Sequence, residues 1–92
     1  MYNGWTNYYT WDAYNWMTSE EPTYIYWTDR ARQATAEAEG DKDRGAGILS
    51  DVIREELTDQ APELGASMYS DFLGYALQQI NCYELAKAFM EE

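Results

Sequence analysis

An aromatic-rich segment at residues 2–16 constrains the fold of this chain most strongly. It holds three of the four tryptophans and four of the nine tyrosines, and Asp12 is its only charged residue. A chain of 92 residues buries only about 60 to 65% of its unfolded surface, so it needs large side chains. Each buried aromatic ring removes roughly 150–250 Å² from water. We therefore expect one small domain, residues 1–92, with aromatic residues of this segment in its core. The expected core residues are Trp5, Tyr8, Trp11 and Trp16.

Apolar periodicity predicts an all-α fold of about five short helices, because apolar residues recur at helical spacing and no run alternates with period two. The expected helices are residues 7–17, Pro22 to about Glu37, Ile48–Leu57, Met68–Ile80 and a last helix after Asn81. Thr6 or Asn7 is expected to cap the first helix, and Asn81 the last, with Glu84 three residues on.

Two further expectations concern exposure. Met68, Phe72, Ala76 and Ile80 are spaced by four, which predicts a well-buried helix. Residues 39–47, with three glycines and five charges, are expected to form a mobile, exposed loop.

The residues for catalysis or metal binding are mostly missing from the sequence. The chain has no histidine and one cysteine, Cys82, so it can form neither an internal disulfide nor a usual Cys/His zinc site. Residues 40–47 contain glycines, but their aspartates would repel phosphate. Paired carboxylates are plentiful, but acid/base chemistry needs a cleft that a small helical bundle seldom supplies. We expect no enzyme, no metal and no cofactor, and we expect Cys82 in the core.

The N-terminal residues lack a signal-peptide pattern, and no apolar run is long enough to span a membrane. The expected location is therefore the cytoplasm.

Net charge narrows the class of partner. Seventeen acidic against six basic residues give −11, which disfavours binding to nucleic acid and to anionic membranes and favours basic protein surfaces. Solubility and adaptation to high salt are the alternative explanations of this charge.

The acidic residues gather in two clusters. Asp51, Glu55 and Asp59 recur every four residues, so they share a helix face with neighbours about 5–6 Å apart, close to the spacing of nucleic-acid phosphates. Glu56 and Glu63 extend this cluster, and Arg54 is its one opposing charge. The second cluster comprises Glu37, Glu39, Asp41 and Asp43. A solvated helix face remains the alternative interpretation of the first cluster.

The tyrosines outside the core suggest a second kind of surface. Tyr9, Tyr14, Tyr24 and Tyr26 exceed the needs of one small core, so some of them are expected at the surface. Tyrosine is enriched in binding hot spots, and beside carboxylates it can hold Arg or Lys through charge and cation–π contact. We take Tyr24 and Tyr26 as candidate partner-binding residues.

The segment "NGWTNYYTW" at residues 3–11 resembles the "NGWTNYETWN" start of a family of small acidic proteins from phages, plasmids and prokaryotic genomes. "MYSDFLGYALQQIN" at residues 68–81 is similar to the C-terminal pattern of the same family. The resemblance implies a mobile-element setting, where small acidic proteins often inhibit host defence by binding.

Two hypotheses follow. The leading one is a non-enzymatic inhibitor that mimics DNA on a basic nucleic-acid-binding effector, a CRISPR effector first and a restriction enzyme second. The alternative is a small interaction or assembly module that docks or self-associates through its tyrosines, with acidity serving only solubility.

Overall fold

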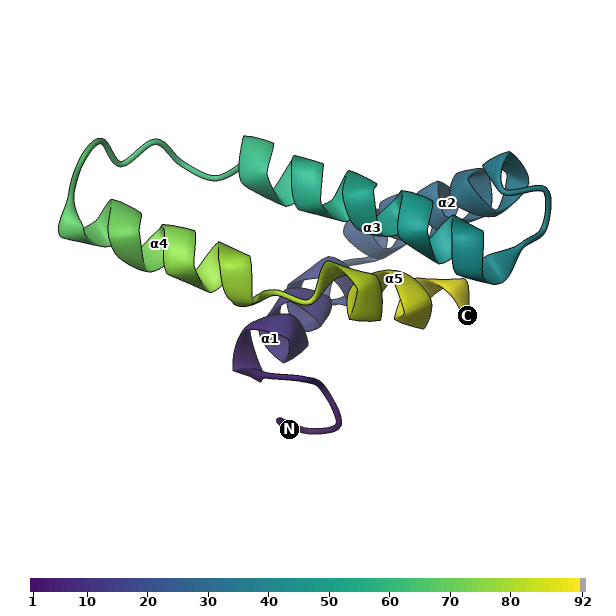
Figure 1. Cartoon of the computed structure of the whole chain (residues 1–92), viewed down its shortest axis with the longest axis horizontal. Helices are drawn as coiled ribbons and strands as arrows, with labels where there is room; N and C mark the ends of the chain where they lie inside the picture. Colours follow the sequence, from purple (N-terminus) through teal and green to yellow (C-terminus); the bar gives the residue numbers. More distant parts are fainter. Residues whose placement is uncertain (92) are drawn as a thin grey trace.

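The computed structural model describes residues 1–91 and confirms a single small all-α domain (Figure 1). Its helices are α1 (Tyr8–Thr18), α2 (Glu21–Glu37), α3 (Lys42–Asp59), α4 (Met68–Gln79) and α5 (Cys82–Met90). Over the described residues, none of these helices combines the length and the apolar character needed to cross a bilayer.

The core lies where α3 packs against α2 and α5. Its fully buried large apolar residues are Leu49 and Ile53 of α3 and Leu85 of α5. Small residues of α2, Ala31 and Ala34, let the three helices approach closely. Cys82 is also buried, as expected, and desolvation raises the pKa of its thiol.

The expected loop at residues 39–47 is wrong over most of its length, because α3 already begins at Lys42. The side chain of Asp41 caps this helix by accepting a hydrogen bond from the Arg44 N–H. Gly45 is buried, and a Cβ there would lie 2.4 Å from Met90 Cε and 3.4 Å from the Ala34 carbonyl oxygen. Gly45 therefore serves a close helix contact rather than a mobile loop.

The N-terminal motif forms a turn and a helix cap. Asn3 and Gly4 have positive φ angles of 47° and 87°, which turn the chain so that Tyr2 and Trp5 exchange backbone hydrogen bonds of 2.7 and 2.8 Å. The Asn7 side chain then accepts the Thr10 N–H at 2.9 Å and caps α1. The expected capping role of Asn7 is confirmed.

The same motif ties α1 to the junction between α4 and α5. Asn7 Nδ2 donates to the Gln79 carbonyl oxygen at 2.7 Å. Thr10 Oγ1, a fully buried polar group, accepts the Asn81 N–H at 2.9 Å and donates to Asn7 Oδ1 at 2.8 Å. Asn81 in turn caps α5 by accepting the Glu84 N–H at 3.0 Å, which confirms its predicted role.

Replacing Thr10 with valine should destabilise the fold by about 1–2 kcal/mol, because the Asn81 N–H loses its partner at a nearly isosteric side chain. The control is Thr28→Val. The Thr28 hydroxyl only donates back to the Tyr24 carbonyl oxygen of its own helix, at 2.8 Å, so its loss should cost little. Urea unfolding of both variants measures the difference. Equal stabilities would contradict a locking role for Thr10.

The expectation that α4 is well buried is wrong, because none of its residues is buried. Figure 1 shows α4 running out to one end of the molecule. Its aromatic side chains stay open to solvent, with Phe72 61% exposed. The long axis of the molecule measures 43 Å and the radius of gyration is 13.7 Å, more than the roughly 30 Å and 12 Å expected of a compact chain this long.

Two of the four expected core aromatics are also exposed. Trp16 is 70% exposed and Tyr8 lies largely at the surface, where its ring meets those of Tyr2 and Trp11. Trp5 packs against the core and against the Tyr14 ring, at a centroid distance of 4.7 Å, and Trp11 is half-buried. The aromatic segment therefore contributes only in part to the core, and the remainder forms surface.

Candidate partner-binding surfaces

The acidic stripe, defined here as Asp51, Glu55 and Asp59, lies on the solvent side of α3. All three side chains are exposed, while Leu49 and Ile53 occupy the buried side of the same helix. Within the part of the chain that the structure describes, no Lys or Arg forms an ion pair with any of the three. The stripe therefore presents carboxylates that the fold leaves uncompensated by direct ion pairs.

The sequence suggested that the charge of Arg54 opposes the stripe, but the structure shows that it does not. Its guanidinium points away and donates to the carbonyl oxygens of Leu77 and Ile80, at the C-terminal end of α4. A cation is favourable there because the last carbonyls of a helix carry partial negative charge. The position of Arg54 both anchors α4 and leaves the stripe negative.

The second acidic cluster does not continue the stripe. Glu37, Glu39, Asp41 and Asp43 are exposed around the α2–α3 turn, at the N-terminal end of α3. Asp43 and Asp51 are separated by about 12 Å along the helix axis at 1.5 Å per residue. Two of the cluster's carboxylates have local roles, since Asp41 caps α3 and Asp43 lies 3.9 Å from Lys87 Nζ.

Glu63 follows the stripe in the segment after α3, where it is exposed. By its place in the chain it remains a candidate extension of the stripe. The turn cluster is a separate patch.

Tyr24 and Tyr26 do not form one surface, because they project from different sides of α2. Tyr24 packs partly against the core. Tyr26 is 43% exposed, and its hydroxyl donates to Glu56 Oε1 on α3. Glu56 also lies 3.4 Å from the Arg30 guanidinium, so it is turned away from the stripe, and the expectation that it extends the stripe is wrong. Of the two predicted tyrosines, only Tyr26 stands next to acidic side chains of α3.

The hydrogen bond to Glu56, followed by desolvation, raises the pKa of Tyr26 above its ordinary value of 10.0. Neutral Tyr26 is therefore favoured in the fold. Its contribution to stability is present below pH 10.0 and is lost as the pH rises through the folded pKa.

Glu56→Gln should lower the Tyr26 pKa toward 10.0, because the amide carries no charge to oppose tyrosinate. The measurement is ultraviolet titration of tyrosinate, with Tyr26→Phe spectra subtracted to isolate this residue. The control is Glu55→Gln, one residue away on the solvent side of α3. If Glu56→Gln and Glu55→Gln give the same titration curve, the hydrogen bond between Tyr26 and Glu56 does not set the pKa of Tyr26.

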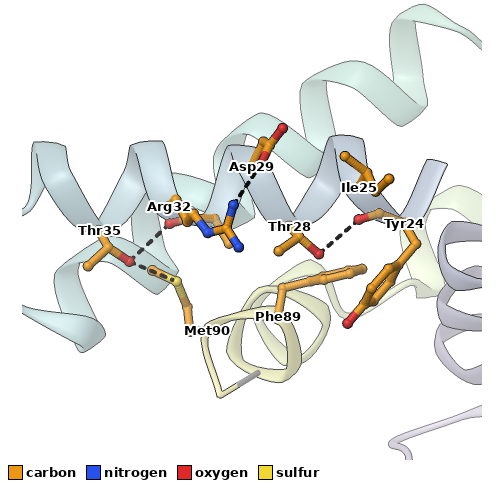
Figure 2. Close-up of a pocket in the computed structure, with 9 residues that line it drawn as sticks. Tyr24, Ile25, Thr28, Asp29, Arg32, Thr35, Phe89 and Met90 are labelled. Atoms are coloured by element: carbon orange, nitrogen blue, oxygen red, sulfur yellow. Dashed lines mark hydrogen bonds and ion pairs between the residues drawn. The ribbon is translucent and has the colours of Figure 1, made fainter. Parts of the chain in front are cut away.

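A cavity of about 390 Å³ lies between α2 and α5 (Figure 2). Several of its polar groups are engaged within the fold. Asp29 pairs with Arg32 at 3.1 Å, and the Thr28 and Thr35 hydroxyls donate to the carbonyl oxygens of Tyr24 and Ala31. Residues 1–91 also hold no cluster of three or more metal-ligating side chains.

An apolar groove of about 350 Å³ lies between α1, α4 and the C-terminal end of α3. Trp16, Trp27, Leu57, Leu73 and Leu77 are among the residues that line it. The sequence pattern missed this surface, because the same apolar spacing that predicts burial also describes a face left open. The signal available was that apolar side chains surround most of α4, more than one small core can cover.

These features define a small all-α protein with an acidic helix face and an open apolar groove. Comparisons with known protein families, with curated proteins and with solved structures found no match. The acidic helix face and the apolar groove are therefore the features of this protein that bear on its function.

Proposed function

We propose that this protein is a non-enzymatic inhibitor of a prokaryotic defence system. In this proposal the acidic stripe, with Glu63, occupies the basic nucleic-acid-binding surface of an effector, a CRISPR effector first and a restriction enzyme second. One observation carries the proposal: Asp51, Glu55 and Asp59 stand exposed on one face without an ion pair in the described chain.

The spacing of the stripe suits a surface built for phosphates. Residues four apart on a helix are about 5–6 Å apart, so the three carboxylates form a row about 12 Å long. Like charges at this spacing cost a few tenths of a kcal/mol per pair, and the fold accepts that cost twice. A use for the row would account for its retention.

Long-range charge favours the same partner. A net charge of −11 attracts a basic groove and accelerates encounter with it, while nucleic acid itself is repelled. The total remains below that of duplex DNA, which carries about 25 charges over 43 Å. The stripe would therefore replace a short stretch of one strand, and other contacts would have to supply part of the affinity.

The resemblance of residues 3–11 to phage- and plasmid-borne proteins supports a setting in which such an inhibitor is useful. The structure gives those motif residues another role as well, since Asn7 and Thr10 lock α1 to the α4–α5 junction. The motif is thus needed for the fold, and the binding role falls on α3.

The test is protection in cells and inhibition in vitro. Cells with an active CRISPR system, and separately a restriction system, are challenged with phage while expressing the protein. Purified effectors are then assayed for target cleavage with increasing inhibitor. Restored plating together with stoichiometric inhibition of an effector supports the proposal. Full immunity and unchanged cleavage across both classes would refute it.

A second candidate function is a small interaction module whose acidity serves only solubility. The observation that favours it is the exposed apolar surface, with Phe72 and Tyr75 of α4 and, separately, Trp16 of α1 largely exposed. Such a module should bind with little salt dependence, whereas the acidic stripe should release its partner as salt rises. Gel filtration of a complex at low and high salt separates the two functions.

A further inference from the structure

We propose that the outer side of α4, together with tyrosines at the start of the chain, is the contact surface of a homodimer. This surface is called the aromatic face, and its residues are Tyr2, Tyr8, Tyr9, Met68, Tyr69, Phe72 and Tyr75. The inference rests on the second candidate function and deepens it by naming a second copy of this chain as the partner. It does not depend on the acidic stripe of α3.

The aromatic face is continuous from α4 to the N-terminal segment. Tyr75 of α4 meets Tyr9 of α1, with ring centroids 6.2 Å apart. The ring contacts then continue from Tyr9 to Tyr8 at 5.8 Å and from Tyr8 to Tyr2 at 5.3 Å. All four of these tyrosines are exposed, so the row of rings is open to solvent. Measured contacts therefore join the two parts of the face into one patch.

On α4 the aromatic face lies away from the groove. Met68, Phe72 and Tyr75 recur at i, i+4 and i+7, so they share one side of the helix. Leu73 and Leu77, which line the groove, project about 150° away from that side at 3.6 residues per turn. Met68, Phe72 and Tyr75 are each more than half exposed. The aromatic face is therefore a separate surface from the groove.

The open area of the aromatic face is close to what a stable dimer needs. The exposed fractions run from 36% at Tyr9 to 65% at Tyr69, and with about 200 Å² for each whole side chain they leave roughly 700 Å² open. The largest apolar patch of a typical monomer is about 300–600 Å². Each partner of a standard stable interface contributes about 800 Å². The aromatic face is thus larger than a monomer usually exposes and nearly large enough for one half of an interface.

The chemistry of the aromatic face suits a second copy better than a basic partner. None of its seven residues is charged, and aromatic residues and Met are enriched at interface cores while Asp, Glu and Lys are depleted. Asp71, the only charged residue among Met68–Gln79, projects about 100° away from Phe72. A symmetric dimer applies the same patch on both sides, so an uncharged patch can face its own copy without like charges meeting.

The most acidic part of the chain lies far from α4. Figure 1 shows the start of α4 at one end of the molecule and the α2–α3 turn, with its acidic cluster, at the other end. The long axis measures 43 Å, whereas charges in physiological salt are screened beyond about 8 Å. Pairing through α4 therefore does not bring the two turn clusters together, and the net charge of −11 opposes it only weakly in salt.

The experiment is sedimentation equilibrium of the full chain over about 1–500 µM, at low and high salt. The variants Phe72→Ser and Tyr75→Ser each remove one ring from the aromatic face. Because no residue of α4 is buried, both variants should keep the monomer fold, which circular dichroism checks. The matched controls are Ile25→Ser in the cavity between α2 and α5 and Trp16→Ser in the groove, both at exposed apolar residues.

We expect the wild type to dimerise with a dissociation constant below about 100 µM. Phe72→Ser and Tyr75→Ser should each weaken the dimer by about tenfold or more, and the two controls should not. Rising salt should strengthen the dimer, because it screens the repulsion between two acidic copies. Effector binding through the stripe should respond to salt in the opposite direction, so the two interactions can be told apart.

Three results would overturn the inference. The first is a chain that stays monomeric at about 500 µM, and binding of another protein through Phe72 by such a monomer would uphold the second candidate function without the dimer. The second is a dimer that Trp16→Ser dissociates while Phe72→Ser and Tyr75→Ser leave it intact, which would place the contact in the groove. The third is a dimer that rising salt dissociates, because charged groups would then hold it together.

Discussion

Replacing Leu49 with alanine is expected to destabilise the fold by about 3 kcal/mol, the largest effect of any single truncation considered. Leu49 is fully buried on α3, where α2 and α5 meet it. The substitution removes apolar contacts and leaves a cavity that a small core refills poorly. This loss is a large part of the roughly 5–15 kcal/mol total stability of a typical domain. Because each kcal/mol shifts the melting temperature of a domain this small by about 4–8 °C, the melting temperature should fall by about 12–24 °C.

Leu64→Ala is the control for this prediction, because it removes the same atoms from a side chain that is 43% exposed. Leu64 lies between α3 and α4, and its loss should cost less than about 0.5 kcal/mol. Circular dichroism during thermal and urea unfolding measures both. If the two variants unfold together, the core is not where α3, α2 and α5 meet.

Reversing two charges of the acidic stripe is expected to weaken effector binding by at least about 100-fold, or ~2.7 kcal/mol, with the fold intact. In the Asp51→Lys, Glu55→Lys variant, both changed side chains point to solvent and contact no ion-pair partner in the described chain. Folding should therefore be unaffected within about 0.5 kcal/mol. Binding should suffer because lysines would then face a basic surface.

The matched control is Glu20→Lys, Glu21→Lys, which changes net charge by the same amount at the start of α2. Both of those side chains are exposed. A general effect of net charge would weaken binding equally in the two variants, and a local effect would appear only on α3. Equal affinities for wild type and the α3 variant would reduce the stripe to a solvated face.

Much of the local structure was predictable because caps and periodicity act over a few residues. The end of α2 at Glu37 and the caps at Asn7 and Asn81 follow from such local patterns. The acidic stripe was predictable for the same reason, since spacing along one helix decides which residues share a face.

What the sequence could not show depends on contacts between distant segments. Gly45 suggested a loop in the sequence. In the structure its lack of a side chain lets α2 and Met90 of α5 approach α3 closely. Arg54 is separated from Ile80 by 26 residues, so its bond to the end of α4 has no local signal. Apolar spacing in α4 predicted a buried face, but whether another element covers that face is a property of the whole fold.

Competition between duplex DNA and this protein for one inhibited effector tests directly whether α3 mimics DNA. Labelled target DNA is bound to the effector, the protein is added at several salt concentrations, and the composition of the complexes is measured. Mimicry of DNA predicts mutually exclusive binding, with the apparent affinity of the protein falling steeply as salt rises. A stable complex that holds effector, DNA and this protein together would contradict mimicry of DNA by α3.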